Sequence, residues 1–595
     1  MMWKTIFAVP VLYCLHSLIS LLHNRSLARK TKLPYILFPV YEANLFYIAL
    51  FGMRWFQYMI SNWLPEGLAD HIHDSMYRNR WAVKDRMAKR YGGVYLYVTP
   101  GGISCHVVDA DIVEQVVRAR QCFLKPVKHL EGFDMFGSSI FTAEGSQWSY
   151  HHRNTAPAFN DKNDALVWAE GIRQAKEMAD YWDAMYSDPS NSVSSFVVPD
   201  AREDILKLSL NIICGAGFGV RLPFKPALTA TADDAGDLFK DAATPSPGYY
   251  FTFRGVMEYM NRSMMSVFVA NGILPKWIPR FTLPFLKKDF AAHKDLGNYL
   301  HALVKDAEKS ESETHNLLER LVRSRRDEEE IITTKRNPGL SDAEILGNVF
   351  IFSIAGHETT ATTLRFALAL LAIHSDVQEK LYNELQTVMR DEPADPAEWD
   401  YATVFPRLVT PLCILLETLR LYPPVPSIPK LTASSGADIT CNDEIHHLPP
   451  EVRVNLNSNA LHYSERYWGT DASVFNPSRW DKRNAESYLA RNDDVQGLSG
   501  PGLESNEIHK PERGAYIPFS DGMRGCIGRK FAQVEFIATL AVLFREYRVS
   551  LANLPGESTD DARRRVEKAL RESSALLTLA IMEEVPLSFR RRGVA

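Results

Sequence analysis

The pattern of apolar and polar positions separates an apolar N-terminal stretch from a long, mainly helical remainder. Residues 5–22, "TIFAVPVLYCLHSLISLL", are nearly all apolar, which predicts a helix long enough to cross much of a bilayer. Helical periodicity dominates the middle of the chain. At the C-terminus, residues 575–592 carry apolar runs on either side of Glu583 and Glu584, which suggest a closing β-hairpin. The pattern predicts a mainly α protein with small β-sheets, preceded by an N-terminal transmembrane helix.

The charges that flank the N-terminal stretch predict its orientation. Lys4 alone precedes the stretch, whereas four basic residues follow it: Arg25, Arg29, Lys30 and Lys32. This asymmetry favours a retained anchor with the bulk of the chain on the cytoplasmic side. A cleaved secretory signal is the alternative, although residues 23–25, His-Asn-Arg, lack the small side chains of a cleavage site.

A second apolar segment, residues 35–56, is interrupted by Pro39, Glu42 and Asn44. These interruptions favour a segment that lies in the membrane interface, with a second crossing as the alternative. We therefore predict an anchor with its basic flank over residues 1–32, a membrane-proximal segment over residues 33–69, and one large catalytic domain over residues 70–595.

Composition and charge narrow the class of protein. A chain of 595 residues with 46% hydrophobic residues can bury an extensive core. The net charge of −5 provides no general attraction to polyanions, so we expect no nucleic-acid partner. The seven cysteines are scattered, and none forms a CxxC pair. This distribution supports neither a disulfide framework nor a zinc site, and it favours a reducing compartment.

A long buried helix is predicted from Ser341 onward. The sequence "SDAE" can form a capping box, and the residues that follow are apolar on almost every side. The centre of this helix nevertheless carries Gly356, Glu358, Thr359 and Thr360. Since glycine costs about 1 kcal/mol relative to alanine inside a helix, it suits a place where a large group approaches the backbone. Helix packing, with hydroxyls bonded to carbonyls four residues earlier, is the alternative.

A charged pair follows in "ILLETLRLYPPVP". Glu417 and Arg420 lie three residues apart on one helical face within an apolar run, so we expect a buried ion pair. A buried pair requires further hydrogen-bond partners, and Arg479 in "FNPSRW" is a candidate.

The stretch "FSDGMRGCIG", residues 519–528, places Cys526 in a glycine-rich turn just before a predicted helix. The helix dipole and free backbone amides there favour a thiolate over a thiol. A small buried hydrophobe is the alternative for this cysteine.

Taken together and in this order, these features resemble the cytochromes P450. The resemblance rests on "AGHETT", Glu-x-x-Arg, Pro-x-Arg-Trp and the cysteine loop, behind an N-terminal anchor. The resemblance covers essentially the whole chain. Within the family, the chain resembles the membrane-anchored, microsomal members of filamentous fungi. The resemblance implies the P450 fold and a heme b cofactor with Cys526 as the axial thiolate.

The resemblance also implies which other residues bind the heme. Phe519, Gly522, Arg524 and Gly528 belong to the cysteine loop, where Arg524 meets a heme propionate. Lys430 takes a propionate-binding position at which arginine is common.

Trp148 matches the family's tryptophan at another propionate site. His152 stands at the position four residues later, where arginine is usual, and Arg153 comes next. Because residues four apart share a helical face, we favour His152 as the propionate partner, with Arg153 directed to solvent.

On the oxygen side, Glu358 and Thr359 match the family's acid–alcohol pair, which implies proton delivery during oxygen activation. Glu417, Arg420 and Arg479 would form a structural cluster. The implied substrate pocket is largely apolar and includes Ile354, Ala355, Leu576 and Leu577.

These features and the resemblance predict a monooxygenase that inserts one atom of O2 into a lipophilic small molecule. We expect it to be anchored in the endoplasmic reticulum membrane by a single span. We also expect it to act in secondary metabolite biosynthesis. The resemblance implies NADPH–cytochrome P450 reductase as the electron donor, with cytochrome b5 as a further donor. Arg529 and Lys530, just beyond the cysteine, are candidates for the docking surface. One alternative is a heme-thiolate isomerase, dehydratase or peroxygenase that needs no reductase. A more remote alternative is a non-catalytic, heme-bearing membrane scaffold.

Overall fold

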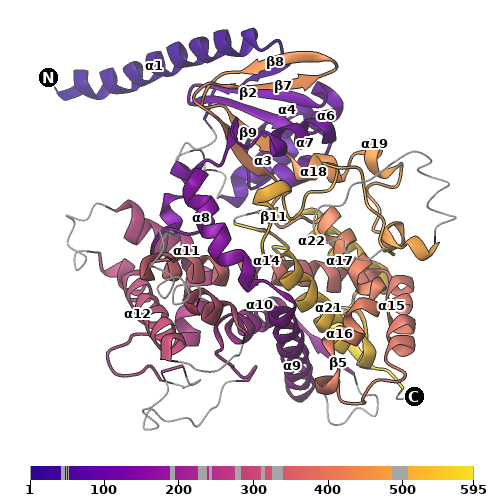
Figure 1. The fold of residues 1–595 in the computed structure, drawn as a ribbon. Coiled ribbons are helices and arrows are strands. Elements are labelled where there is room, and N and C mark those ends of the chain that lie inside the picture. The colour runs from indigo at the N-terminus through magenta and orange to yellow at the C-terminus, as the bar shows by residue number, and fades with distance from the viewer. Residues whose placement is uncertain are drawn as a thin grey trace. The chain divides into compact units, whose positions relative to one another are not determined.

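The computed structural model (Figure 1) describes residues 2–41, 47, 50, 53–187, 195–225, 238–239, 244–274, 283–309, 315–323, 339–484, 507–575 and 577–593. The chain forms two compact units, each assembled from separate stretches of sequence. Unit 1 comprises Met1–Pro126, Leu416–Cys526 and Lys568–Met582, and unit 2 comprises Val127–Leu415, Ile527–Glu567 and Glu583–Ala595. The mainly α architecture with small sheets is confirmed. The domain boundaries at residues 32 and 69 stay predictions.

Unit 1 is built around a six-stranded sheet. Its strands run in the order β1 (Tyr35–Leu37), β2 (Val94–Thr99), β3 (Gly102–Val107), β9 (Arg453–Leu456), β6 (Ile428–Thr432) and β4 (Phe123–Leu124). Helix α7 (Ala110–Arg118) follows β3 and buries Ile112, Val113 and Val116 in the same core. Two short hairpins complete the strands of this unit: β7 (Ala437–Cys441) with β8 (Glu444–Leu448), and β11 (Ser574–Ala575) with β12 (Leu579–Ala580).

Helix α1 (Met2–Lys30) has two different halves. Its C-terminal half packs against the sheet of unit 1, where Ala28 is buried and the side-chain amide of Asn24 donates a hydrogen bond of 2.8 Å to the carbonyl of Thr99. Further toward the N-terminus, large apolar side chains are exposed: Leu12, Tyr13, Leu15, Leu18, Ile19 and Leu22.

Among the described residues, no single helix is both long and apolar enough to cross a membrane. One pair of helices bent by 62°, Tyr401–Arg407 and Val409–Leu421, meets that requirement by length and composition. The transmembrane helix therefore stays a prediction. The segment expected at the membrane interface, residues 35–56, begins as strand β1, and Phe38 lies in the core. Its placement at the interface stays a prediction.

Unit 2 is a helical assembly. Four helices pack against one another at its centre: α9 (Asp161–Tyr186), α10 (Arg202–Ile212), α14 (Asp342–Ile373) and α21 (Arg529–Glu546). A Cβ atom at Gly171 of α9 would lie 3.1 Å from Cβ of Ala538 in α21, so the glycine permits this close packing. Further helices surround them, namely α8 (Gly145–Thr155), α11 (Phe253–Phe268), α12 (Lys287–Lys309) and α15 (Ser375–Val388).

The predicted C-terminal hairpin is wrong. Strand β12 pairs with β11, whereas β13 (Leu587–Arg591) pairs with β10 (Tyr547–Leu551) and with β5 (Ser195–Val198). The two apolar runs beside Glu583 and Glu584 thus join different sheets in different units. The partner strands of β13 lie much earlier in the sequence, so the spacing of the two runs could not identify them.

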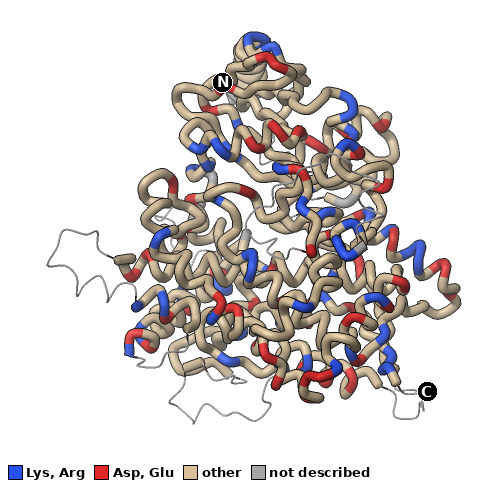
Figure 2. Tube along the Cα trace, turned by 45° about the vertical axis from the view of Figure 1, so that its right-hand side comes forward, with Lys and Arg blue, Asp and Glu red and all other residues tan. Residues whose placement is uncertain are grey.

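Acidic and basic residues are interspersed along the chain (Figure 2). Helix α22 (Thr559–Arg571) illustrates this pattern, since Arg563 pairs with Glu567 and Arg564 pairs with Asp561 along the same helix. Such exposed pairs contribute little to stability.

Candidate functional site

Helix α14 begins as the sequence predicts. The backbone amide of Ser341 donates to Oε2 of Glu344 at 2.9 Å, and the Glu344 amide donates to the Ser341 hydroxyl at 3.4 Å, which completes the capping box. The helix then continues for 32 residues, most of them buried, including Ile354. The prediction of a long buried helix is confirmed.

The centre of α14 is open on one face only. Ala355 is exposed, and Gly356, Glu358 and Thr359 are partly exposed, whereas His357 and Thr360 are buried. A Cβ atom at Gly356 would meet Ile213 at 3.5 Å, an ordinary contact, so packing does not by itself require the glycine. This open face suits the approach of a bound group to the helix backbone.

The threonine hydroxyls of this helix do bond back to carbonyls one turn earlier. Oγ1 of Thr359 donates to the carbonyl of Ala355 at 2.9 Å, and Thr360 donates to Gly356 at 3.2 Å. The packing alternative is therefore realised alongside the open face. A hydroxyl that donates its hydrogen still has lone pairs, and the partly exposed oxygen of Thr359 can accept from a water or a ligand.

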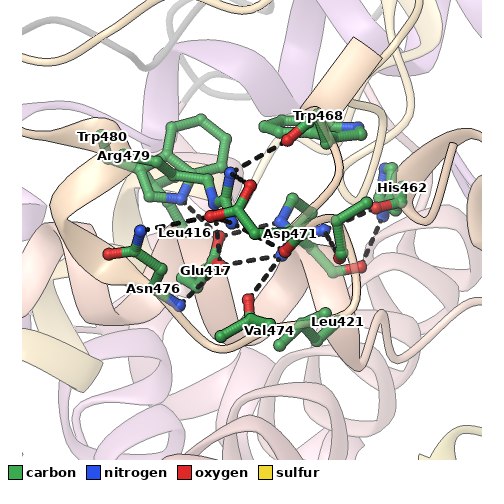
Figure 3. Close-up of polar contacts among 12 residues, drawn as sticks. Leu416, Glu417, Leu421, His462, Trp468, Asp471, Val474, Asn476, Arg479 and Trp480 are labelled. Atoms are coloured by element: carbon green, nitrogen blue, oxygen red, sulfur yellow. Dashed lines mark hydrogen bonds and ion pairs between the residues drawn. The ribbon is translucent and has the colours of Figure 1, made fainter. Parts of the chain in front are cut away.

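Glu417 and Arg420, the charged pair near the end of α17 (Val409–Leu421), are fully buried in unit 1. Figure 3 shows the polar contacts around Glu417. Arg420 donates from Nε and Nη2 to the two carboxylate oxygens of Glu417, both at 2.8 Å, and Nε of Arg479 donates to Oε1 at 3.0 Å. The predicted three-residue cluster is thus brought together. The sequence did not indicate two further donors to Glu417, which are the Asn476 amide and Nε1 of Trp480, each at 2.9 Å.

The partners of Glu417 decide its charge state. Burial raises the pKa of Glu417, but Arg420 and then Arg479 outweigh it, so the net shift of the pKa is downward. Arg420 also donates to the carbonyls of His462, Ala472 and Val474, which satisfies its remaining N–H groups. This network ties the end of α17 to the chain between residues 462 and 480.

The cysteine loop is a tight turn in unit 1. Gly522 has φ +67°, and a Cβ atom there would lie 2.5 Å from Cγ1 of Val117, so this position requires glycine. The amide of Cys526 donates to the carbonyl of Phe519 at 2.8 Å and closes the loop. Helix α21 follows, with Gly528 as its N-cap residue.

Cys526 is exposed, whereas Cys105, Cys214 and Cys413 are buried. The alternative of a buried packing cysteine is therefore wrong. An exposed sulfur at the start of an 18-residue helix, beside glycines and two residues from the partly exposed Arg524, is a donor set that fits a heme. A Cβ atom at Gly528 would meet only Phe159 of the described residues, at 3.8 Å, which leaves room for a flat group.

The other predicted heme contacts come from helix α8 and strand β6. The Trp148 and His152 rings lie 4.9 Å apart, so these residues share a face of α8 as expected, while Arg153 is exposed. Lys430 is buried on β6. The roles of His152, Arg153 and Lys430 toward a propionate stay predictions.

Of the pocket residues, Ile354 is buried and Ala355 exposed on α14, while Leu577 lies in unit 1 between β11 and β12. The carbonyl of Leu577 accepts a hydrogen bond of 3.3 Å from the Tyr77 hydroxyl. Leu576 lies outside the described residues.

The sequence did not lead us to predict the polar contacts of Asn348 in α14. The Asn348 side chain contacts Nδ1 of His151 at 3.0 Å, and its oxygen accepts from the amide of Ile140 at 2.9 Å. An asparagine inside an otherwise apolar helix does indicate such contacts, because a buried amide requires hydrogen-bond partners.

Comparisons with known proteins agree with this arrangement. A family model described as Cytochrome P450 matches residues 71–573. A cytochrome P450 monooxygenase of Arthrobotrys oligospora is 30% identical over 577 residues, which cover 94% of each chain. The phomenoic acid biosynthesis cluster cytochrome P450 monooxygenase of Leptosphaeria maculans is 23% identical and covers 81% of this chain and 80% of its own length.

The fold is also that of a solved structure. The crystal structure of the cytochrome P450DA heme domain matches with a TM-score of 0.61 and 20% identity, covering 85% of this chain and 91% of that one. This likeness concerns the fold, while the family match extends over most of the sequence. The chain belongs to the cytochrome P450 family.

Proposed function

We propose that the protein is a heme-thiolate monooxygenase that inserts one oxygen atom from O2 into a lipophilic small molecule. The observation that carries this proposal is the exposed thiol of Cys526 in its glycine turn at the start of α21. A place in secondary metabolite biosynthesis is supported by the relative from a phomenoic acid biosynthesis cluster.

The residues described above would hold heme b, which supplies the iron at which dioxygen is activated. Cys526 would ligate the iron through its thiolate, and Arg524 would form charge-assisted hydrogen bonds with a propionate. Trp148, His152 and Lys430 would contribute further propionate contacts. Phe519 would keep water away from the sulfur, while Gly522 and Gly528 would let the backbone come close to the cofactor.

Thr359 and Glu358 handle protons in this proposal. The Thr359 hydroxyl is fixed by its bond to the Ala355 carbonyl, so its oxygen presents lone pairs in a defined direction and can hold a water. The partly exposed Glu358 carboxylate exchanges protons with solvent and passes them to that water.

The substrate and the electron donor follow from the same assignment. Ala355, which is exposed on α14, provides apolar surface for a lipophilic substrate. NADPH–cytochrome P450 reductase, with cytochrome b5 as a second donor, docks on a basic surface that includes Arg529 and Lys530. From there it supplies the electrons for the reaction. The exposed apolar residues of α1 support an anchor in the endoplasmic reticulum membrane.

Replacement of the cysteine tests the ligand assignment. We expect Cys526→Ala to abolish the red-shifted Soret band of the reduced carbon-monoxide complex. Cys122→Ala, which changes another exposed cysteine, is the matched control and should keep the band. Persistence of the band in Cys526→Ala contradicts the assignment.

A second experiment tests the use of oxygen. Thr359→Ala should divert NADPH electrons into peroxide, whereas Thr359→Ser, which keeps the hydroxyl, should restore coupling. Reconstitution with reductase, labelled O2 and a lipophilic metabolite extract should give labelled product. Turnover without NADPH and reductase would favour an isomerase, dehydratase or peroxygenase instead.

A further inference from the structure

One fully buried acid of unit 2, Glu535, is not used by the site described above. Glu535 of α21 is fully buried, and neither oxygen of its carboxyl group has a hydrogen-bond partner among the described residues. Burial raises the pKa of Glu535 to about 8. The group is therefore a neutral carboxylic acid at neutral pH, with one O–H to donate.

The hydroxyl of Ser209 on α10 lies beside the carboxyl group of Glu535. It is fully buried, lies close enough to lower the pKa of Glu535, and yet lacks the geometry of a direct hydrogen bond to it or to any other described residue. Two facing polar groups without a direct bond are commonly bridged by a water.

A third unpartnered atom belongs to α14. Nδ1 of His357 lies 2.7 Å from the carbonyl of Ser353 and must donate to it, so Nε2 is left as an acceptor. The His357 side chain is buried, and Nε2 has no partner among the described residues. Burial lowers the pKa of His357 to about 4, so the ring is neutral.

The register of α10 against α14 places His357 near Ser209. Asp200, just before α10, pairs with Arg365 at 3.0 Å, and Ile213, just after it, faces Gly356. The two helices are therefore antiparallel, and Ser209, one turn before Ile213, lies opposite the turn between His357 and Thr360. Helix α21, which carries Glu535, packs against α14 as well.

We propose that Glu535, Ser209 and His357 form an internal water site that fixes the turn of α14 carrying Glu358 and Thr359. The donors and acceptors match: the Glu535 carboxyl donates to a water, the water donates to Nε2 of His357, and Ser209 completes its coordination. A buried water needs two to four polar partners, and these three side chains provide them. Glu535 is thus a positioning residue for the proton-handling pair.

Infrared spectra of the heme-loaded protein test the acid directly. Below about pH 8 we expect the carbonyl band of a protonated carboxylic acid, shifted in D2O and lost above that pH. The band should be absent in Glu535→Gln and unchanged in Glu546→Gln, which alters a partly exposed glutamate at the end of the same helix. A band that persists in Glu535→Gln, or one that is missing from the wild type, overturns the proposal.

The link to α14 rests on the proposed function and has its own measurement. Glu535→Leu should split or broaden the infrared band of carbon monoxide bound to the reduced heme, whereas Glu535→Gln, which can still donate, should keep one narrow band. Identical carbon-monoxide bands in the two variants overturn the positioning role. The carboxyl band requires no heme ligand, so failure of the heme assignment is distinguishable from failure of the water site.

Discussion

Glu417 and Glu535, which are both fully buried among the described residues, differ in their charge states. Glu417 in unit 1 receives hydrogen bonds from Arg420, Arg479 and Trp480, and its pKa is lowered. Glu535 in unit 2 faces a serine hydroxyl, and its pKa is raised to about 8. Burial acts in the same direction on both groups, so the partners determine whether the buried carboxyl group is an anion or an acid.

The largest effect is expected at Glu417. Glu417→Gln leaves Arg420 buried without its counter-charge, while Arg479 keeps its ion pair with Asp471. The loss should lower the free energy of unfolding by about 3–5 kcal/mol. Urea unfolding of the heme-loaded protein measures the change. Glu465→Gln, at an exposed ion pair with Lys89, is the control and should change stability by less than about 0.5 kcal/mol. Equal effects of the two variants would contradict the buried-network account.

Arg479→Gln should cost less than Glu417→Gln. The paired bonds between Arg420 and Glu417 remain, and the loss is that of the hydrogen bonds to one charged group, about 1.5–3 kcal/mol. The same urea titration compares the two variants. A larger loss for Arg479→Gln would mean that Arg420 alone does not keep Glu417 ionised.

At Glu535 the comparison predicts that the free energy of unfolding depends on pH. Between about pH 4.5 and about pH 8, the group is ionised in the unfolded chain and protonated in the folded one. The folded state therefore binds more protons, and stability falls as pH rises by about 1.4 kcal/mol per pH unit, relative to Glu535→Gln. Unfolding midpoints of both proteins across this range measure the slope, and parallel curves would show that Glu535 is ionised when folded.

The smallest effect is expected at Ser209. Its hydroxyl lowers the pKa of Glu535, so Ser209→Ala should move the midpoint of the carboxyl infrared band to higher pH by a fraction of a unit. Thr539→Val is the control, since the Thr539 hydroxyl donates to the backbone carbonyl of Glu535 and not to its carboxyl group. A shift of equal size in the control would remove Ser209 from the water site.

The sequence predicted the local parts of this protein well. The capping box at Ser341 and the Glu417–Arg420 pair depend on residues three apart, and both occur in the structure. The sequence did not indicate the strand partners of the C-terminus, nor the donors from Asn476 and Trp480, because these contacts join residues that are distant along the chain. The roles assigned to Lys430 and His152 stay predictions.

The sequence by itself determined the family and the chemistry of its residues: a cysteine before a helix, an acid and an alcohol in a buried helix, and an acid three residues from an arginine. Periodicity and spacing carry this information because helix geometry relates near neighbours directly. Only the tertiary structure decided which of these groups are exposed and which carry charge. Cys526 is exposed and Glu535 is fully buried, because the solvation and the partners of a side chain depend on segments that the fold brings together.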